Sequence, residues 1–451
     1  MKDLKPNYSE MPDWELYAPM LLSEYQQCID EGLDIEQYKD LFVKVANLPQ
    51  SEGRERLADA LFFVVQNAKI KDGYKYNEPS DLDSIKKLRK KYDFKAESLE
   101  NVDIEDKIYG AWLGRICGCL LGKTVEGART DELIPFLKET GNYPMYRYIL
   151  KSDATDEICS KYSFGFGKTC HADTCDGMPV DDDTNYVVLA QMIIDEYGRD
   201  FKPSDVSKAW LDYQSIYAYF TAERVAFCNF IKGYQPPQSA EYKNAYREWI
   251  GAQIRGDYFG YINPGDSETA SDMAFRDASI SHIKNGIYGE MWASAMISCA
   301  AVTDNIEDII FGGLSKIPYT SRLYEAIRDI VSFYKDGVSY DECVKEIHKR
   351  FDEHTGYGWC HTISNAMIVA ASLLYGEGDF GKSICMAVQA GFDTDCNGAT
   401  VGSVLGMRGG KGCIGKEWTE PLKDTLHTSI FGVGTVKISD RVKMTLSHLK
   451  K

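Results

Sequence analysis

Glycine recurs at every fourth position in two separate stretches of this sequence, and that spacing limits the folds the chain can adopt. The first run is Gly110, Gly114, Gly118 and Gly122, and the second is Gly398, Gly402, Gly406 and Gly410. Because residues four apart lie on one face of an α-helix, each run predicts a helix with one face free of side chains. Glycine costs a helix about 1 kcal/mol per position relative to alanine. The spacing therefore predicts that another helix packs closely against each smooth face.

Acidic residues stand at one end of each glycine run. The first run leads into Thr124-Val125-Glu126, and the second follows Gly391-Phe392-Asp393-Thr394-Asp395. We expect the two helices to bring these carboxylates together at one mouth of a helical core.

The composition is that of an ordinary globular protein. The 451 residues are 44% hydrophobic and 26% charged, and this length suits one large domain or about two to three ordinary ones. The net charge of −17 argues against a nucleic-acid-binding or anionic-membrane surface spread over the molecule. Binding of an anionic small molecule is compatible with this net charge, because bound cations and helix N-termini can make the local potential positive.

The sequence has 13 cysteines and no signal-peptide pattern at its first residues, which predicts a cytoplasmic protein with free thiols. The glycine runs also raise the question of a membrane span, because such runs occur in transmembrane helices. Here Arg115, Lys123 and Arg408 interrupt them, so we expect no membrane span.

Helical patterns also indicate how the chain is organised. Apolar spacing predicts helices at residues 24–28, 38–46 and 54–65, and a charged stretch follows at 85–91. We interpret residues 1–100 as an N-terminal helical accessory module and residues 104–440 as the catalytic domain. The module contains no acidic or histidine constellation, so we expect it to supply no catalytic group.

The rest of the chain is mostly helical in pattern. The further predicted helices cover residues 183–194, 270–283, 291–302, 321–334, 340–351, 362–375 and 380–390. Residues 130–179 show no clear period and predict an extended insertion, and Gly312-Gly313 predicts a turn. Alternating β-branched segments are scarce. The predicted fold class is all-α.

Three consecutive aspartates, Asp181, Asp182 and Asp183, precede an apolar run that begins at Tyr186. One aspartate suffices to cap a helix, whereas three repel one another unless a cation holds them. Asp393 and Asp395 stand in the same way before the second glycine run. Since hard divalent cations take oxygen ligands, the two acidic helix starts predict a shared pair of metal ions.

Other candidates have weaker patterns. Cys170-His171 with Cys175, and Cys360-His361, contain zinc-ligand residue types, but their spacings match no standard zinc site. We expect most of the cysteines to be buried thiols. For His361 two interpretations stay open: a residue lining the ligand cleft, or a capping or packing residue. Tyr357 and Trp359 could stack on an adenine, although aromatic core residues are commoner.

Four stretches of the sequence resemble motifs of the ADP-ribosylglycohydrolases, in the same order. Residues 106–114 with 122–127 resemble the opening helix of that family and its glutamate, and Asp181-Asp182-Asp183-Thr184 resembles its Thr/Ser-Asp-Asp-Thr motif. Residues 278–282 resemble the family's Ala-x-x-Thr-His segment. Residues 391–395 resemble its Gly-Gly-Asp-Thr-Asp motif. The resemblance covers roughly residues 104–440.

The resemblance implies a specific set of site residues. Two Mg²⁺ ions, or Mn²⁺ in their place, would be bound by Asp182, Asp183, Asp393 and Asp395, with Asp181 where the family has Thr or Ser. Glu126 would lie beside them as the catalytic proton-transfer group. The ADP-ribose would contact residues Gly251 to Arg255 and His282, and His361 is the further candidate in the cleft.

The sequence departs from the family pattern at three more positions. Cys396 stands where the family has a Thr or Ser ligand, Cys119 replaces an aspartate, and Phe392 replaces a glycine. A thiol is a poor ligand for Mg²⁺. We expect the extra carboxylate of Asp181 to compensate for Cys396.

The function implied is that of a Mg²⁺-dependent hydrolase that cleaves an ADP-ribosyl, or related ribosyl, glycosidic linkage. Its substrate would be an ADP-ribosylated protein or a small ADP-ribosyl or ribosyl compound. Two alternatives stay open: a two-metal phosphohydrolase using the same acidic cluster, and a non-catalytic ADP-ribose-binding protein.

Overall fold

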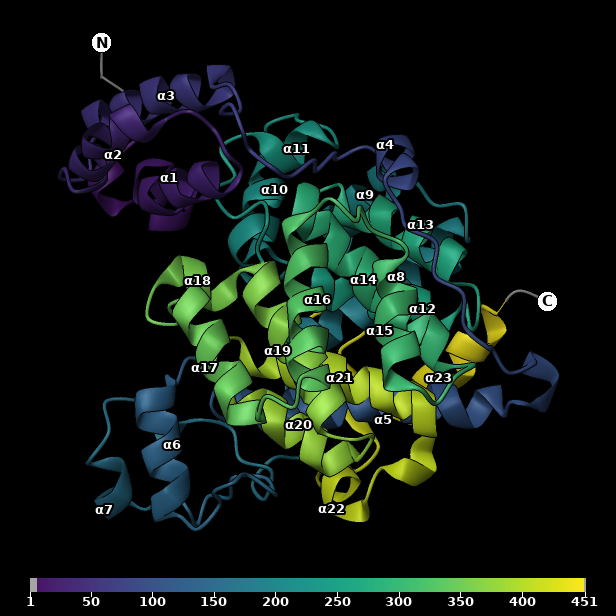
Figure 1. The fold of residues 1–451 in the computed structure, drawn as a ribbon. Coiled ribbons are helices and arrows are strands. Elements are labelled where there is room, and N and C mark those ends of the chain that lie inside the picture. The colour runs from purple at the N-terminus through teal and green to yellow at the C-terminus, as the bar shows by residue number, and fades with distance from the viewer. Residues whose placement is uncertain (1–5, 450–451) are drawn as a thin grey trace.

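The computed structural model describes residues 6–449, and its architecture is all-α (Figure 1). Within that range, 23 α-helices and one hairpin of two short strands account for the regular structure, together with single turns of 3₁₀-helix. This confirms the fold class predicted from the sequence.

The elements follow the chain in this order. The first five helices are α1 (Leu21–Asp30), α2 (Lys39–Ala46), α3 (Glu52–Asn67), α4 (Leu82–Lys87) and α5 (Ile104–Lys123). The next eight are α6 (Thr130–Glu139), α7 (Asp156–Cys159), α8 (Asp182–Tyr197), α9 (Pro203–Tyr213), α10 (Thr221–Ile231), α11 (Gln238–Glu241), α12 (Asp257–Tyr261) and α13 (Ser267–Ala278). Then come α14 (Lys284–Ala300), α15 (Ile306–Leu314), α16 (Arg322–Lys335), α17 (Tyr340–Arg350), α18 (Gly356–Cys360), α19 (Thr362–Tyr375) and α20 (Phe380–Gln389). The chain ends with α21 (Thr394–Gly409), α22 (Lys416–Thr419), β1 (Thr425–His427), β2 (Thr435–Lys437) and α23 (Ile438–Ser447).

The two glycine helices, α5 and α21, pack directly against each other. A Cβ atom placed on Gly114 would lie 2.1 Å from the carbonyl oxygen of Gly402, and one placed on Gly118 would lie 1.9 Å from that of Gly398. Side chains would therefore prevent this approach, which explains the glycine spacing. Because the partner number falls as the α5 number rises, the helices run antiparallel, and the end of α5 meets the start of α21.

Long buried helices surround this pair. Every residue of α14 from Asn285 to Ala300 is buried, as are residues Thr362 to Leu374 of α19. The apolar side chains of these helices and of α8 belong to one continuous hydrophobic core. The glycine pair is thus held inside the molecule, with the meeting point of its two ends fixed by the surrounding helices.

Helices α1 to α3 form a lobe of their own, drawn in purple at the upper left of Figure 1. Its core consists of side chains such as Leu21, Phe42 and Leu61, and it is closed by Val225 and Ala245 from the main body. Residues 69–103 then lead from the lobe along the body: a backbone bridge joins Ile70 to Leu33 of the lobe, and another joins Arg89 to Pro318 of the body. The division of the chain near residue 100 stays a prediction.

The structure corrects two sequence-based expectations. The segment 130–179 is not wholly extended: it contains α6 and α7, and Phe136 of α6 stacks on Phe166 at 3.9 Å. Pro135 inside α6 had hidden the helical period. Gly312 and Gly313 form no turn but lie within α15, where they allow close contact with Cys299 and Trp292 of α14.

Further helices were missed, among them α9 and α10. Between residues 6 and 449, no helix is both long and apolar enough to span a bilayer.

Candidate metal centre

Three helix ends meet at one side of the α5–α21 pair. The end of α5 carries Lys123, and Glu126 follows in the next turn. The start of α8 brings its N-cap Asp181 with Asp182 and Asp183, and the start of α21 brings Asp395. Since helix N-termini carry partial positive charge, both acidic starts are placed where carboxylates are favoured.

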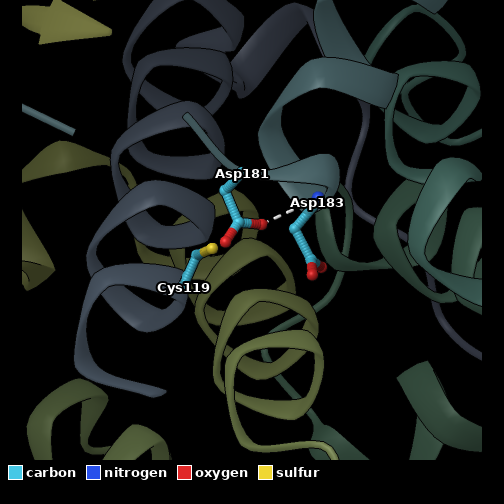
Figure 2. A group of neighbouring side chains, drawn as sticks. All are labelled: Cys119, Asp181 and Asp183. Atoms are coloured by element: carbon cyan, nitrogen blue, oxygen red, sulfur yellow. Dashed lines mark hydrogen bonds between the residues drawn. The ribbon is translucent and has the colours of Figure 1, made fainter. Parts of the chain in front are cut away.

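Carboxylate and thiol atoms from these ends lie close enough together to share an ion. Three groups have ligand atoms within 4.8 Å of one another: Cys119 with Asp181 and Asp183, Asp183 with Asp395 and Cys396, and Glu126 with Asp181 and Asp395. Figure 2 shows the first group, in which the Cys119 sulfur points towards the Asp181 carboxylate. Asp181 and Cys396 belong to different groups, which are joined through Asp183 and Asp395. Compensation of Cys396 by Asp181 stays a prediction.

Asp181 is held from two directions. Its Oδ1 accepts a hydrogen bond of 2.9 Å from the backbone N–H of Asp183, the dashed line in Figure 2. Its Oδ2 accepts one of 2.7 Å from the Lys123 ammonium. The capping role and the ion pair therefore coexist in one buried side chain.

Asp183 is paired with a second internal cation. Arg115 donates to the Asp183 carboxylate at 2.9 Å and to the carboxylate of Asp257 at 2.8 Å. Its remaining contacts are the backbone oxygens of Asp183 and Ile254. The other carboxylate oxygen of Asp183 accepts from the Cys396 thiol at 3.2 Å. Both carboxylate oxygens of Asp183 thus accept a hydrogen bond from the protein.

Asp395 differs from both, because its Oδ1 is buried and has no hydrogen-bond partner among the described residues. A buried carboxylate oxygen without a donor is costly unless a cation satisfies it. Asp393 lies nearby and accepts a hydrogen bond of 3.4 Å from the Cys360 thiol. The unmet demand for positive charge is therefore centred on Asp395.

Burial and mutual repulsion dominate the electrostatics of the cluster. The pKa values of Asp182, Asp183 and Asp393 are raised well above the ordinary range, first because burial disfavours the ionised form and then because the carboxylates repel. The pKa of Glu126 is raised to about 9, chiefly by the charge of Asp395. A bound cation would reverse this effect. The donor set, mostly carboxylate oxygen, fits a hard divalent ion.

The backbone before Asp393 is unusual. Gly391 and Phe392 both have positive φ, of 80° and 58°. A phenylalanine rarely adopts this left-handed conformation, and here its ring is buried and packs on His348 with centroids 4.5 Å apart. Phe392 therefore adopts the left-handed backbone conformation that glycine favours, and the packing of its ring offsets the conformational strain.

An open cleft of about 310 Å³ adjoins the cluster. Lys123, Glu126 and Asp182 line one part of it. Tyr217 and Phe220, which are 70% and 50% exposed, lie in another part. The cluster is consequently accessible to a small molecule from solvent.

Comparison with known proteins identifies the family. A family model described as ADP-ribosylglycohydrolase matches residues 100–444. The chain belongs to the ADP-ribosylglycohydrolase family. No curated protein matches the chain. Among solved structures, it is similar to one titled "ADP-ribosylglycohydrolase-related protein complex", with 16% sequence identity, coverage of 77% of this chain and 98% of that chain, and a TM-score of 0.45.

The residues that the family resemblance assigns to ADP-ribose, Gly251 to Arg255 and His282, are buried and do not line the cleft. Arg255 is buried and pairs with Glu223 at 3.1 Å and Asp277 at 2.6 Å. Gly251 packs against Glu223, since a Cβ placed on it would lie 1.8 Å from the Glu223 carboxylate. His282 is fully buried, and its pKa is lowered by burial and by Arg255. Their role in binding stays a prediction.

His361 is also fully buried. Its Nδ1 accepts a hydrogen bond of 3.1 Å from the backbone N–H of Ile363 and so caps α19. Of the two interpretations left open by the sequence, the structure shows the capping contact. Tyr357 is buried too and donates to Asp30 at 2.7 Å, and Trp359 packs against Arg129.

Sequence reasoning missed the two cations of the centre, Arg115 and Lys123, and the cleft residues Tyr217 and Phe220. A signal for the cations was present. Arg115, Cys119 and Lys123 are spaced by four residues in a glycine helix, so they share a second face, and that face points at the acidic start of α8. No histidine belongs to any of the three ligand groups found in residues 6–449.

Proposed function

We propose that this member of the ADP-ribosylglycohydrolase family is a Mg²⁺-dependent hydrolase that cleaves an ADP-ribosyl, or related ribosyl, glycosidic linkage. The observation that carries the proposal is the buried, unpartnered Oδ1 of Asp395, within a carboxylate cluster that borders an open cleft. A buried carboxylate oxygen without a donor is stabilised by a bound cation, and the adjoining cleft has room for a ligand beside that cation.

The metal would be held by carboxylates from the three helix ends, namely Glu126, Asp181, Asp182, Asp183, Asp393 and Asp395, with Mn²⁺ as the alternative ion. When bound, a divalent ion of this kind holds the ribose hydroxyls and lowers the pKa of a coordinated water. The protein fixes the carboxylates through the helix N-termini and the glycine contact, so that little reorganisation is needed.

Glu126 is the residue proposed to move a proton. It is exposed in the cleft beside Asp395, unlike the other carboxylates of the cluster. Cleavage at C1 of the ribose passes through an oxocarbenium-like transition state, in which the attacking water must lose a proton and the leaving group must gain one. A carboxyl group at the cleft surface can serve either transfer.

Tyr217 and Phe220 suggest where a nucleoside would lie. Both rings are exposed at the cleft, and aromatic faces stack on nucleobases without a hydrogen-bond code. The acceptor released would be a protein side chain or a small molecule.

The test is incubation of the protein and Mg²⁺ with ADP-ribosylated arginine and serine peptides, followed by chromatography for free ADP-ribose. Release of ADP-ribose supports the proposal. Glu126→Gln should keep the ligand-induced thermal shift but lower turnover by about 100-fold or more. Phosphate release from a phosphate ester without ADP-ribose would favour the phosphohydrolase alternative. A thermal shift without any product would favour the binding protein.

A further inference from the structure

Lys123 and Arg115 both pair with the acidic cluster, but they are held very differently. The donors of Arg115 contact Asp183, Asp257 and Ile254, and its side chain is 1% exposed. Lys123 makes one hydrogen bond, to Asp181 Oδ2, and its side chain is 23% exposed where it lines the cleft. Arg115 is therefore a fixed part of the core, whereas the lysine ammonium can move on its flexible stem.

The position of that ammonium conflicts with a bound ion. Asp181 Oδ1 is already used by the backbone N–H of Asp183, so Oδ2 is the oxygen that faces another cation. A metal shared by Glu126, Asp181 and Asp395 needs ligand atoms that lie within 4.8 Å of one another. It would therefore stand within a few ångströms of the ammonium, where two positive charges repel strongly.

We infer that the Lys123 ammonium is an internal counter-ion of Asp181 that competes with the divalent cation for the position between Glu126, Asp181 and Asp395. In the metal-free protein it neutralises a carboxylate that is buried and next to two further aspartates. On metal binding it gives up Asp181 and turns into the cleft. The inference rests on the metal role proposed above for the cluster.

This arrangement also accounts for the third consecutive aspartate. Asp181 adds a negative charge to a cluster that already repels itself, and Lys123 cancels that charge in the absence of metal. In this pair, the Lys123 ammonium neutralises Asp181 until a divalent metal ion binds. Metal affinity is consequently lower than the carboxylates alone would give.

The test is a titration of Mn²⁺ into the full-length protein, with free Mn²⁺ followed by electron paramagnetic resonance. Lys123→Met should bind Mn²⁺ at least about tenfold more tightly than the wild type, because the competing charge is gone. In EDTA its Tm should fall, since the buried Asp181 carboxylate has lost its cation, and its Mn²⁺-induced rise in Tm should be larger. If Lys123 had only a structural role, its replacement would not tighten Mn²⁺ binding.

Two further variants complete the experiment. Lys123→Gln keeps a donor for Asp181 and loses only the charge, so it serves if the methionine variant does not fold. Lys107→Met is the matched control on the same helix, because Lys107 is bonded to the Arg408 carbonyl and not to the cluster. Its Mn²⁺ affinity should equal that of the wild type.

Unchanged or weaker Mn²⁺ binding by the folded Lys123 variants would overturn the inference. If the wild type still binds Mn²⁺ and releases ADP-ribose in that case, the proposed function stands and only the competition is wrong. If neither the wild type nor the Lys123 variants bind Mn²⁺, the metal centre and the inference both fail.

Discussion

Asp395 lies in the first turn of α21, 2% exposed, with one carboxylate oxygen that no donor reaches within the described residues. The surrounding carboxylates raise the free energy of the metal-free fold, because each additional ionised group repels the others. In the proposed metal centre, the same oxygen that is unfavourable without an ion would become a ligand of that ion. Metal binding and stability are therefore linked at this residue.

Asp395→Asn should raise the Tm measured in EDTA, because it removes one of the repelling charges. It should also abolish the increase in Tm that Mg²⁺ gives the wild type. Differential scanning fluorimetry with and without Mg²⁺ measures both. Asp341→Asn is the matched control: Asp341 is exposed in the first turn of α17, and its loss should leave the Mg²⁺ effect intact. An undiminished Mg²⁺ shift in Asp395→Asn would rule out this ligand.

His361 predicts how stability depends on pH. Burial lowers its pKa to about 4, and the charge of Arg322 acts in the same direction. The carboxylates of Glu248, 3.9 Å from the ring, and of Asp30 and Glu31 only partly oppose this lowering. The unfolded chain has a histidine pKa of about 6.5. Between these values only the unfolded state binds the proton, so stability falls as the pH drops from about 6.5 to 4, by roughly 3 kcal/mol in all.

His361→Asn should remove this component, because asparagine is a good N-cap that does not titrate. Urea unfolding at pH 7 and pH 4.5 gives the difference, which should be smaller in the variant than in the wild type. The exposed His354, replaced by Asn, controls for the loss of a histidine as such. An equal pH dependence in wild type and His361→Asn would contradict the assignment.

Some of the site could be predicted from residues alone. The carboxylates were found because a run of like charges at a helix start has no purely structural purpose. Lys123 was not predicted, since its contact with Asp181 depends on α8 lying opposite α5, and these helices are distant in the chain. Tyr217 and Phe220 were missed for the same reason: nothing local distinguishes an aromatic residue at a cleft from one in a core.

At the level of elements, α5 and α21 behave as one unit, because backbone contacts backbone along both helices. Gly114→Ala would place a methyl group 2.1 Å from the Gly402 carbonyl oxygen. It should destabilise the protein by at least about 3 kcal/mol. Gly53→Ala is the control in a helix with space, where the nearest atom would be 3.9 Å away. It should be neutral or stabilising by up to about 1 kcal/mol.

Denaturant unfolding of both variants measures the difference. If Gly114→Ala were as stable as Gly53→Ala, the close helix contact would be wrong.

The glycine helices could be predicted from the sequence because their period is strong and uninterrupted. Helix α6 could not be predicted, since Pro135 masks its pattern and its Phe136 packs against Tyr162 and Phe166, which lie well beyond the helix in the chain.

At the level of the whole molecule, the N-terminal lobe is joined to the body by buried charges. Arg247 donates to Glu24 of α1 and to Glu31, the residue that follows α1, each at 2.7 Å, and Lys284 also pairs with Glu31. Gln27 of α1 donates to Glu248 of the body at 2.7 Å. Removing the lobe would leave Arg247 and Lys284 without their partners.

Arg247→Met should cost about 3–5 kcal/mol of stability, because the buried carboxylate of Glu24 loses its cation and Glu31 keeps only Lys284. Mn²⁺ affinity should not change, since none of these residues belongs to the metal groups. Urea unfolding and metal titration separate the two effects. Asp212→Asn breaks the exposed pair with Lys208 and should cost less than about 1 kcal/mol. A similarly small cost for Arg247→Met would show that the lobe depends on apolar contacts alone.

The antiparallel glycine contact has a consequence for how a protein of this kind can change over evolution. Inserting or deleting a residue within α5 or α21 would shift one helix against the other and separate Glu126 from Asp395. Loops such as those between α6 and α8 are under no such restriction. Variation in length should therefore accumulate in these loops, while the lengths of the two central helices stay constant. The loops can then change in length while the geometry of the carboxylate cluster is kept.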